Sequence, residues 1–138
     1  MTSAEPLTVV IVGGVAGGMS AAARLRRLDE HAQIVVFERG PEVSYANCGL
    51  PYYVGGAIAE RESLLLQTPA SLRSRFRLDV RVRHDVVRVD TAQKVVEVMD
   101  VETGRRFTQR YDTLILATGA RPRRDEPLSD VPVRSLRT

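Results

Sequence analysis

The only cysteine stands in the most distinctive stretch of the chain, Ser44-Tyr-Ala-Asn-Cys-Gly-Leu-Pro-Tyr-Tyr53. Asn47 precedes Cys48 in a position to cap a helix, and Pro51 is tolerated in a first helical turn but not deeper. We therefore expect Cys48 at a helix amino terminus, where unpaired N–H groups and the helix dipole favour the reactive thiolate. The alternative is a buried cysteine that packs as a small apolar residue.

A strand, a glycine-rich turn and a helix precede this stretch. Residues 7–12 form an apolar run typical of a buried parallel strand, and residues 19–28 predict a helix. Between them, Gly13-Gly-Val-Ala-Gly-Gly18 matches a G-x-G-x-x-G loop at both ends but has Val15 in the middle. Such a loop lets the backbone approach a pyrophosphate and points a helix amino terminus at its charge. The segment therefore predicts a dinucleotide site.

An acidic residue ends the second predicted strand. Residues 34–37 form another apolar run, and Glu38 follows it, 20 residues after Gly18. A carboxylate at this place accepts hydrogen bonds from a ribose 2′-hydroxyl and repels a 2′-phosphate. The alternative is a surface carboxylate after a strand, which the preceding turn and the spacing disfavour.

The first predicted helix carries a polar stripe. Ser20, Arg24 and Arg27 follow one another at i, i+4 and i+7, so they share one face. The apolar residues 22, 25 and 28 occupy a different face, which suits packing on a sheet. A solvated face explains the stripe, whereas an entry for an anionic substrate is the alternative. Stripe geometry alone favours the solvated face.

The second half of the chain predicts one helix and several strands. Thr68 and Pro69 suit the cap and the first position of a helix that runs to about Phe76. Apolar and polar residues alternate in four runs, 78–82, 86–89, 94–99 and 105–110. Together with turns at 90–93 and 102–104, these runs predict a small antiparallel meander. Residues 114–117 predict another buried parallel strand, and the proline-containing tail from 121 to 138 predicts a linker.

The composition excludes several classes of function. With 20 basic and 17 acidic residues the net charge is only +3, and no basic run has interleaved aromatics, so we expect no nucleic-acid partner. The chain has no apolar run of 18 residues, and Met1–Pro6 lacks a signal-peptide core, so we expect no membrane span and a cytoplasmic protein. A single cysteine cannot form an internal disulfide, in keeping with a reducing compartment. We expect no metal site.

Three segments resemble the flavin-dependent pyridine nucleotide–disulfide oxidoreductases, within them the branch with one redox cysteine. These segments are residues 10–29, 36–56 and 111–122, and the second is the most specific. The branch includes coenzyme A-disulfide reductases, NADH oxidases and persulfide reductases. The resemblance implies an α/β fold, namely a Rossmann-like FAD-binding domain with a parallel sheet, flanking helices and a small antiparallel β-meander, which this chain holds incompletely.

The resemblance also implies residues that bind FAD. Glu38 would hold the adenosine ribose, and Arg39 would lie beside the adenine. The residues that would approach the pyrophosphate or the flavin are Gly13, Gly14, Ala16, Gly17, Gly18, Ala117, Thr118 and Gly119.

The resemblance makes Cys48 the catalytic redox nucleophile, with Ser44 and Asn47 positioning the substrate. In coenzyme A-disulfide reductases the polar face of the first helix helps to hold coenzyme A, which favours a substrate-binding role for Ser20 and Arg27. The implied function is the FAD-dependent, NAD(P)H-driven reduction of coenzyme A disulfide or a related small disulfide or persulfide. The lone thiolate would form a mixed disulfide with a small thiol or a sulfenic acid with peroxide.

Two alternatives remain open, a non-catalytic nucleotide-binding module and an NADH oxidase that reduces oxygen or peroxide. Members of the family are much longer and dimeric. We therefore expect residues 1–120 to be the first segment of the FAD-binding domain and 121–138 to lead toward an NAD(P)H-binding domain that this chain lacks. On this view the chain is the N-terminal fragment of a homodimeric enzyme, inactive by itself.

Overall fold

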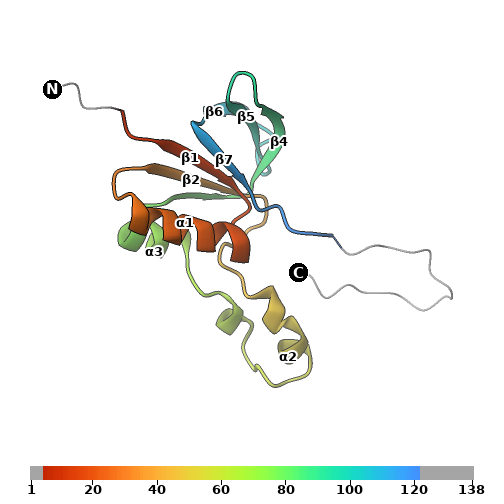
Figure 1. The fold of residues 1–138 in the computed structure, drawn as a ribbon. Helices are drawn as coiled ribbons and strands as arrows, with labels where there is room; N and C mark the ends of the chain where they lie inside the picture. Colours follow the sequence, from red (N-terminus) through yellow and green to blue (C-terminus); the bar gives the residue numbers. More distant parts are fainter. Residues whose placement is uncertain (1–4, 122–138) are drawn as a thin grey trace.

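The computed structural model describes residues 5–121, which build three layers of secondary structure (Figure 1). The central layer is a parallel sheet of order β3-β2-β1-β7, made of β1 (Thr8–Val12), β2 (Gln33–Glu38), β3 (Asp79–Val82) and β7 (Thr113–Leu116). Helices α1 (Ala16–Leu28) and α3 (Pro69–Phe76) cover one face. An antiparallel sheet covers the other, made of β4 (His84–Asp90), β5 (Val95–Asp100) and β6 (Arg106–Arg110). The predicted α/β fold is confirmed.

Strands β1 and β2 are apolar over their middle residues because both of their faces are buried there. Along β1, Val9 and Ile11 pack toward the helices, whereas Val10 packs toward the antiparallel sheet. Val10 pairs in register with Val35 of β2 and Leu114 of β7. Alternate side chains thus enter two different cores, so a parallel strand in this place shows no alternation in its sequence.

Helix α1 begins at Ala16, earlier than the predicted residue 19, so its first turn includes half of the glycine-rich segment. Ala22 is fully buried against the sheet, as expected. Leu28 is 67% exposed, so its predicted packing on the sheet is wrong. It is the last residue of the helix, beyond which the chain turns through Asp29 toward β2.

The strand at residues 79–82 belongs to the parallel sheet, where β3 pairs with β2, and not to the antiparallel meander. Leu78 and Val80 are buried in the core beneath the helices. Pairing with β2 therefore removes these two apolar side chains from water, which stabilises this position of the strand. A parallel neighbour requires a crossover connection, which α3 supplies. The remaining three runs form the meander β4-β5-β6 as predicted.

Thr68 caps α3 as predicted, because its hydroxyl accepts a hydrogen bond from the Ser71 N–H at 3.1 Å and the Ser71 hydroxyl accepts one from the Thr68 N–H at 3.0 Å. Replacing Thr68 by alanine should lower the free energy of unfolding by about 1 kcal/mol. Urea denaturation measures this change. The exposed turn residue Thr91 supplies the control, and equal effects of Thr68→Ala and Thr91→Ala would contradict the capping role.

Residues 45–65, here called the cysteine lobe, project away from the sheet (Figure 1). The lobe contains two 3-10 turns, η1 (Asn47–Gly49) and η2 (Arg61–Leu64), on either side of α2 (Leu50–Val54). Tyr45, Leu50 and Leu64 form a core separate from those of the sheets. The lobe is closed at its base by an antiparallel bridge between Tyr45 and Leu65. Within residues 5–121, no helix has the length and apolarity needed to cross a membrane.

Candidate active site

The glycine-rich loop packs against the carboxyl ends of the central strands. The Gly13 N–H donates to the Phe37 carbonyl at the end of β2, and the Ala117 N–H donates to the Val12 carbonyl, both at 2.8 Å. Gly13 has a φ of +104°, and a Cβ atom there would lie 2.2 Å from the Ala117 carbonyl oxygen. The chain crosses from β1 to β2 on one side and returns as β7 on the other, and open α/β sheets bind their ligands at such a point.

The amino end of α1 leaves room for an anion. Gly17 is exposed, and a Cβ atom there would meet only the Ala117 Cβ, at 3.6 Å. Gly18 differs, because a Cβ atom there would lie 1.8 Å from the Gly13 carbonyl oxygen. The first turn holds no acidic residue and Val15 provides no side-chain cap, so its N–H groups are suited to a pyrophosphate. These residues fit the predicted cofactor.

Glu38 is bound to the loop rather than being a free surface carboxylate. One carboxylate oxygen accepts a hydrogen bond from the Gly14 N–H at 2.8 Å, and the other accepts one from the Gly40 N–H at 2.7 Å. A carboxylate oxygen can accept more than one bond, so capacity for a ribose hydroxyl remains. The role of Gly40 was not predicted, although a glycine two residues after the acidic residue is a signal for a tight turn.

Removing the Glu38 carboxylate should destabilise the chain even without a cofactor. Gly14 is buried, so in Glu38→Ala its N–H loses its partner at a cost of about 1–3 kcal/mol. Chemical denaturation of the cofactor-free protein tests this prediction. The exposed Glu30, whose carboxylate lies 3.4 Å from the exposed His31 ring, offers a control in Glu30→Ala, which should change stability by less than about 0.5 kcal/mol. Indistinguishable values for the two variants would exclude an anchoring role for Glu38.

Cys48 is exposed and lies in η1, immediately before α2. The alternative of a buried packing cysteine is therefore wrong. The expectation that Asn47 caps a helix is also wrong, because Ala46 precedes η1 and Gly49 precedes α2, neither with a side-chain cap. Helix α2 has only five residues, so little helix dipole is available to act on the thiol.

Ser44 joins the cysteine stretch to the glycine-rich loop. Its N–H donates to the Gly14 carbonyl at 2.7 Å, and its backbone is left-handed with a φ of 54°. Val43, the preceding residue, is buried and packs against Gly14, since a Cβ atom added to Gly14 would lie 3.0 Å from the Val43 Cγ2 atom. The backbone of Ser44 thus sets where the cysteine lobe leaves the body of the protein.

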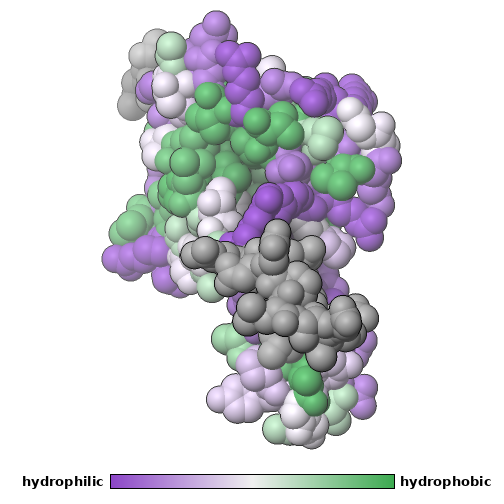
Figure 2. Space-filling view, turned by 90° about the vertical axis from the view of Figure 1, so that its right-hand side faces the viewer, coloured by the Kyte–Doolittle hydropathy of each residue, from purple (hydrophilic) through white to green (hydrophobic). Residues whose placement is uncertain are grey.

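The remaining predicted residues lie in the open. Ser20 and Arg27 are exposed along α1, and within residues 5–121 their side chains make no hydrogen bond or ion pair. Arg39 is exposed after β2, and Thr118 and Gly119 are exposed after β7. Figure 2 shows the side of the molecule on which β7 ends, with a hydrophobic area above the cysteine lobe. Within the described residues no hydrogen bond or ion pair joins the side chains of the α1 stripe to Cys48.

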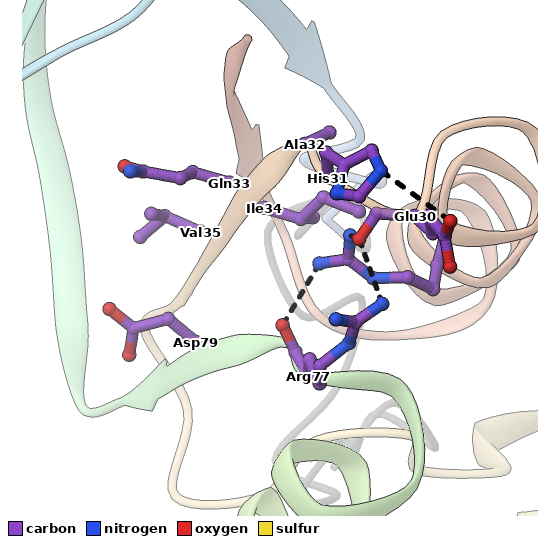
Figure 3. Close-up of a pocket in the computed structure, with 9 residues that line it drawn as sticks. Glu30, His31, Ala32, Gln33, Ile34, Val35, Arg77 and Asp79 are labelled. Carbon is purple, nitrogen blue, oxygen red and sulfur yellow. Dashed lines mark hydrogen bonds and ion pairs between the residues drawn. The ribbon is translucent and has the colours of Figure 1, made fainter. Parts of the chain in front are cut away.

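A separate pocket of about 400 Å³ lies at the opposite end of the sheet, around the start of β2 (Figure 3). Its guanidinium groups are already engaged, because Arg26 donates to the Phe76 and Arg77 carbonyls and Arg77 donates to the Glu30 carbonyl. Burial and the neighbouring Arg77 charge lower the pKa of Arg26. These contacts supply donors to the unpaired carbonyls at the carboxyl ends of α1 and α3. The arginines of this pocket therefore have a structural role, joining the two helices.

The parallel sheet, the glycine-rich loop and the acidic residue after β2 define a Rossmann-like dinucleotide-binding domain. Comparison with protein families is more specific, because residues 7–133 match the family described as pyridine nucleotide-disulphide oxidoreductase. The chain belongs to this family, whose members are FAD-dependent enzymes that use a pyridine nucleotide.

Individual relatives agree with this membership. A coenzyme A disulfide reductase of Staphylococcus epidermidis is 39% identical over 123 residues, which are 89% of this chain and 28% of that protein. The crystal structure of reduced Bacillus anthracis CoADR-RHD superposes with a TM-score of 0.85 and 48% identity over 88% of this chain and 22% of that one. The structure of an NAD-dependent persulfide reductase from A. fulgidus superposes with a TM-score of 0.83 and 38% identity, over 87% of this chain and 22% of that one. The chain therefore spans about a quarter of the length of these relatives.

Proposed function

We propose that this chain is the FAD-binding amino-terminal part of an NAD(P)H-driven reductase of coenzyme A disulfide or a related small disulfide or persulfide, with Cys48 as the nucleophile. The observation that carries the proposal is an exposed Cys48 on a segment whose backbone is bonded, through Ser44, to the glycine-rich loop. The similarity to a coenzyme A disulfide reductase and to a persulfide reductase supports the class of substrate.

The cofactor would lie across the carboxyl ends of the central strands. The glycine-rich loop and the first turn of α1, with Gly13, Gly14, Ala16, Gly17 and Gly18, would hold the pyrophosphate. Glu38 would bind the ribose, Arg39 would lie beside the adenine, and residues 117–119 would approach the flavin. When bound, FAD would supply the electron pair, taken from NAD(P)H, that cleaves the adduct on Cys48.

The chemistry on the protein side is a thiol–disulfide exchange. The Cys48 thiolate attacks one sulfur of coenzyme A disulfide, the S–S bond breaks, and one coenzyme A thiolate leaves. The product is a mixed disulfide between Cys48 and the second coenzyme A. Two electrons and one proton then cleave this bond, which restores the Cys48 thiolate and releases the second coenzyme A as its thiol. Ser44, Asn47, Ser20 and Arg27 would hold the substrate during the exchange.

Intact-mass measurement tests the first step on the chain itself. With coenzyme A disulfide we expect one coenzyme A bound through Cys48 and one thiol released for each adduct, and Cys48→Ser should form none. Iodoacetamide serves as the control for accessibility of the thiol. Alkylation without any mixed disulfide would contradict the proposed substrate. A sulfenic acid formed with peroxide, in the same absence of mixed disulfide, would favour the oxidase.

We further propose that residues 1–120 supply the first segment of the FAD-binding domain and that 121–138 lead toward an NAD(P)H-binding domain. Within residues 5–121, β7 is an edge strand with β1 on its inner side, and its Leu116 is 63% exposed. An edge of this kind, without charged residues, is suited to cover by further protein. The complete enzyme would be a homodimer, and the chain by itself would not turn over.

A further inference from the structure

A bidentate ion pair connects the body of the protein to the cysteine lobe. Arg61 donates from Nη1 to Glu42 Oε1 at 2.8 Å and from Nη2 to Glu42 Oε2 at 3.0 Å. Glu42 belongs to the body, because the next residue, Val43, is buried in the core beneath the helices. Arg61 begins η2 in the lobe. The two residues are 19 positions apart, and the chemistry proposed above uses neither of them.

Arg61 is held in place by a second contact. Its guanidinium carbon lies 5.7 Å from the ring centroid of Tyr45, which is only 8% exposed and belongs to the core of the lobe. A guanidinium that stacks on an aromatic ring and pairs with both oxygens of a carboxylate has a defined orientation. The hydrogen bond and the charge of Glu42 raise the pKa of Arg61, so the guanidinium keeps its charge.

The contacts continue from Arg61 to the cysteine through Leu64, at the other end of η2. Leu64 is 1% exposed, and its carbonyl accepts a hydrogen bond from the Ala46 N–H at 2.8 Å. Gly49 lies directly on the Leu64 side chain, since a Cβ atom on Gly49 would be 2.5 Å from Leu64 Cδ2. Cys48 therefore lies between Ala46 and Gly49, and both of these residues contact Leu64.

We propose that Glu42 and Arg61 are positioning residues that set the orientation of the cysteine lobe, and with it the place of Cys48 relative to the glycine-rich loop. A surface ion pair contributes only about 0–1 kcal/mol to global stability, so its effect here is local. Contacts at the base of the lobe, such as the Ser44–Gly14 hydrogen bond, fix where the lobe attaches, and the ion pair adds a second attachment farther along it. The inference rests on the proposed function only in taking Cys48 as the nucleophile; the orientation of the lobe follows from the contacts alone.

Hydrogen exchange on the chain without cofactor tests this link. Glu42→Gln should speed exchange of the Ala46 and Leu66 amides, which close the base of the lobe, by up to about fivefold, with an unchanged unfolding midpoint. The rate of Cys48 alkylation should change in the same variant. Glu97→Gln is a matched control in β5, since the side chain of Glu97 is 28% exposed against 25% for Glu42, and each binds one arginine.

A charge swap completes the test. Glu42→Arg combined with Arg61→Glu restores an ion pair, and we expect it to restore slow exchange at the base of the lobe. The proposal would be overturned if the Ala46 and Leu66 amides exchanged equally fast in Glu42→Gln and Glu97→Gln. It would also be overturned if Glu42→Gln sped exchange in β5 as much as at the base of the lobe. Loosening of the lobe without any mixed disulfide in the unmodified chain would overturn the proposed function alone, so the two failures are distinguishable.

Discussion

Replacing Cys48 by serine should abolish disulfide reduction, by at least about a thousandfold in kcat. Serine is nearly isosteric but cannot form the mixed disulfide, so the electron pair has no bond to cleave. Because the chain spans about a quarter of its relatives, the assay uses a chimera in which it replaces the 123 matching residues of the Staphylococcus epidermidis reductase. NAD(P)H oxidation with coenzyme A disulfide is the measurement.

The control for this variant lies in the same lobe. Val54 is 66% exposed, so Val54→Ser changes a nearby side chain without touching the thiol, and its kcat should stay within about twofold of the unmodified chimera. Both chimeras should show the same flavin absorbance. A serine variant with substantial disulfide reductase activity would mean that Cys48 is not the nucleophile. Unchanged NADH oxidation with oxygen, together with loss of disulfide reduction, would indicate an oxidase route that bypasses the cysteine.

Replacing Gly18 by alanine should have the largest effect on the fold, although helix propensity alone predicts a gain of about 1 kcal/mol. A Cβ atom at this position would lie 1.8 Å from the Gly13 carbonyl oxygen, a backbone atom that cannot move without opening the loop. We expect a loss of about 3 kcal/mol or more, with FAD binding lost at the same time. Chemical denaturation and flavin titration measure the two effects.

Gly17 is the matched control, because it lies in the same helical turn. Its added Cβ atom would meet only the Ala117 Cβ at 3.6 Å, an ordinary contact, so Gly17→Ala should fold at least as stably as the unmodified chain. It should nevertheless bind FAD more weakly if the cofactor approaches this exposed backbone. Equal stability of the Gly17 and Gly18 variants would refute the packing assigned to the loop.

Local patterns predicted most of the fold because they report burial and chain geometry directly. The apolar runs of β1 and β2 reflect strands buried on both faces, and Thr68 before Pro69 marks the start of α3 through a cap that uses neighbouring residues only. The run at 114–117 predicted a buried strand and this was wrong in burial, because β7 is an edge strand whose Leu116 is 63% exposed. Assigning residues 78–82 to the meander failed because an edge strand shows the same alternation of apolar and polar residues in a parallel sheet as in an antiparallel one.

The features of the site that escaped prediction depend on contacts between distant residues. Nothing in the neighbourhood of Glu42 indicates its pairing with Arg61, and the left-handed backbone of Ser44 occurs at a residue type that rarely adopts it. The capping role predicted for Asn47 failed because α2 begins later than expected, at Leu50. Tertiary packing of Gly49 on Leu64, and not local capping, determines where the cysteine turn lies.

The most direct test of the central claim is an FAD titration of the purified chain, followed by its visible absorbance spectrum. We predict a bound-flavin spectrum with one FAD for each chain, weakened in Glu38→Ala and lost in Gly18→Ala. Binding with this pattern of effects would show that the glycine-rich loop and Glu38 form the cofactor site. Absence of flavin binding by the folded chain, and by the chimera that supplies the rest of the protein, would contradict the account.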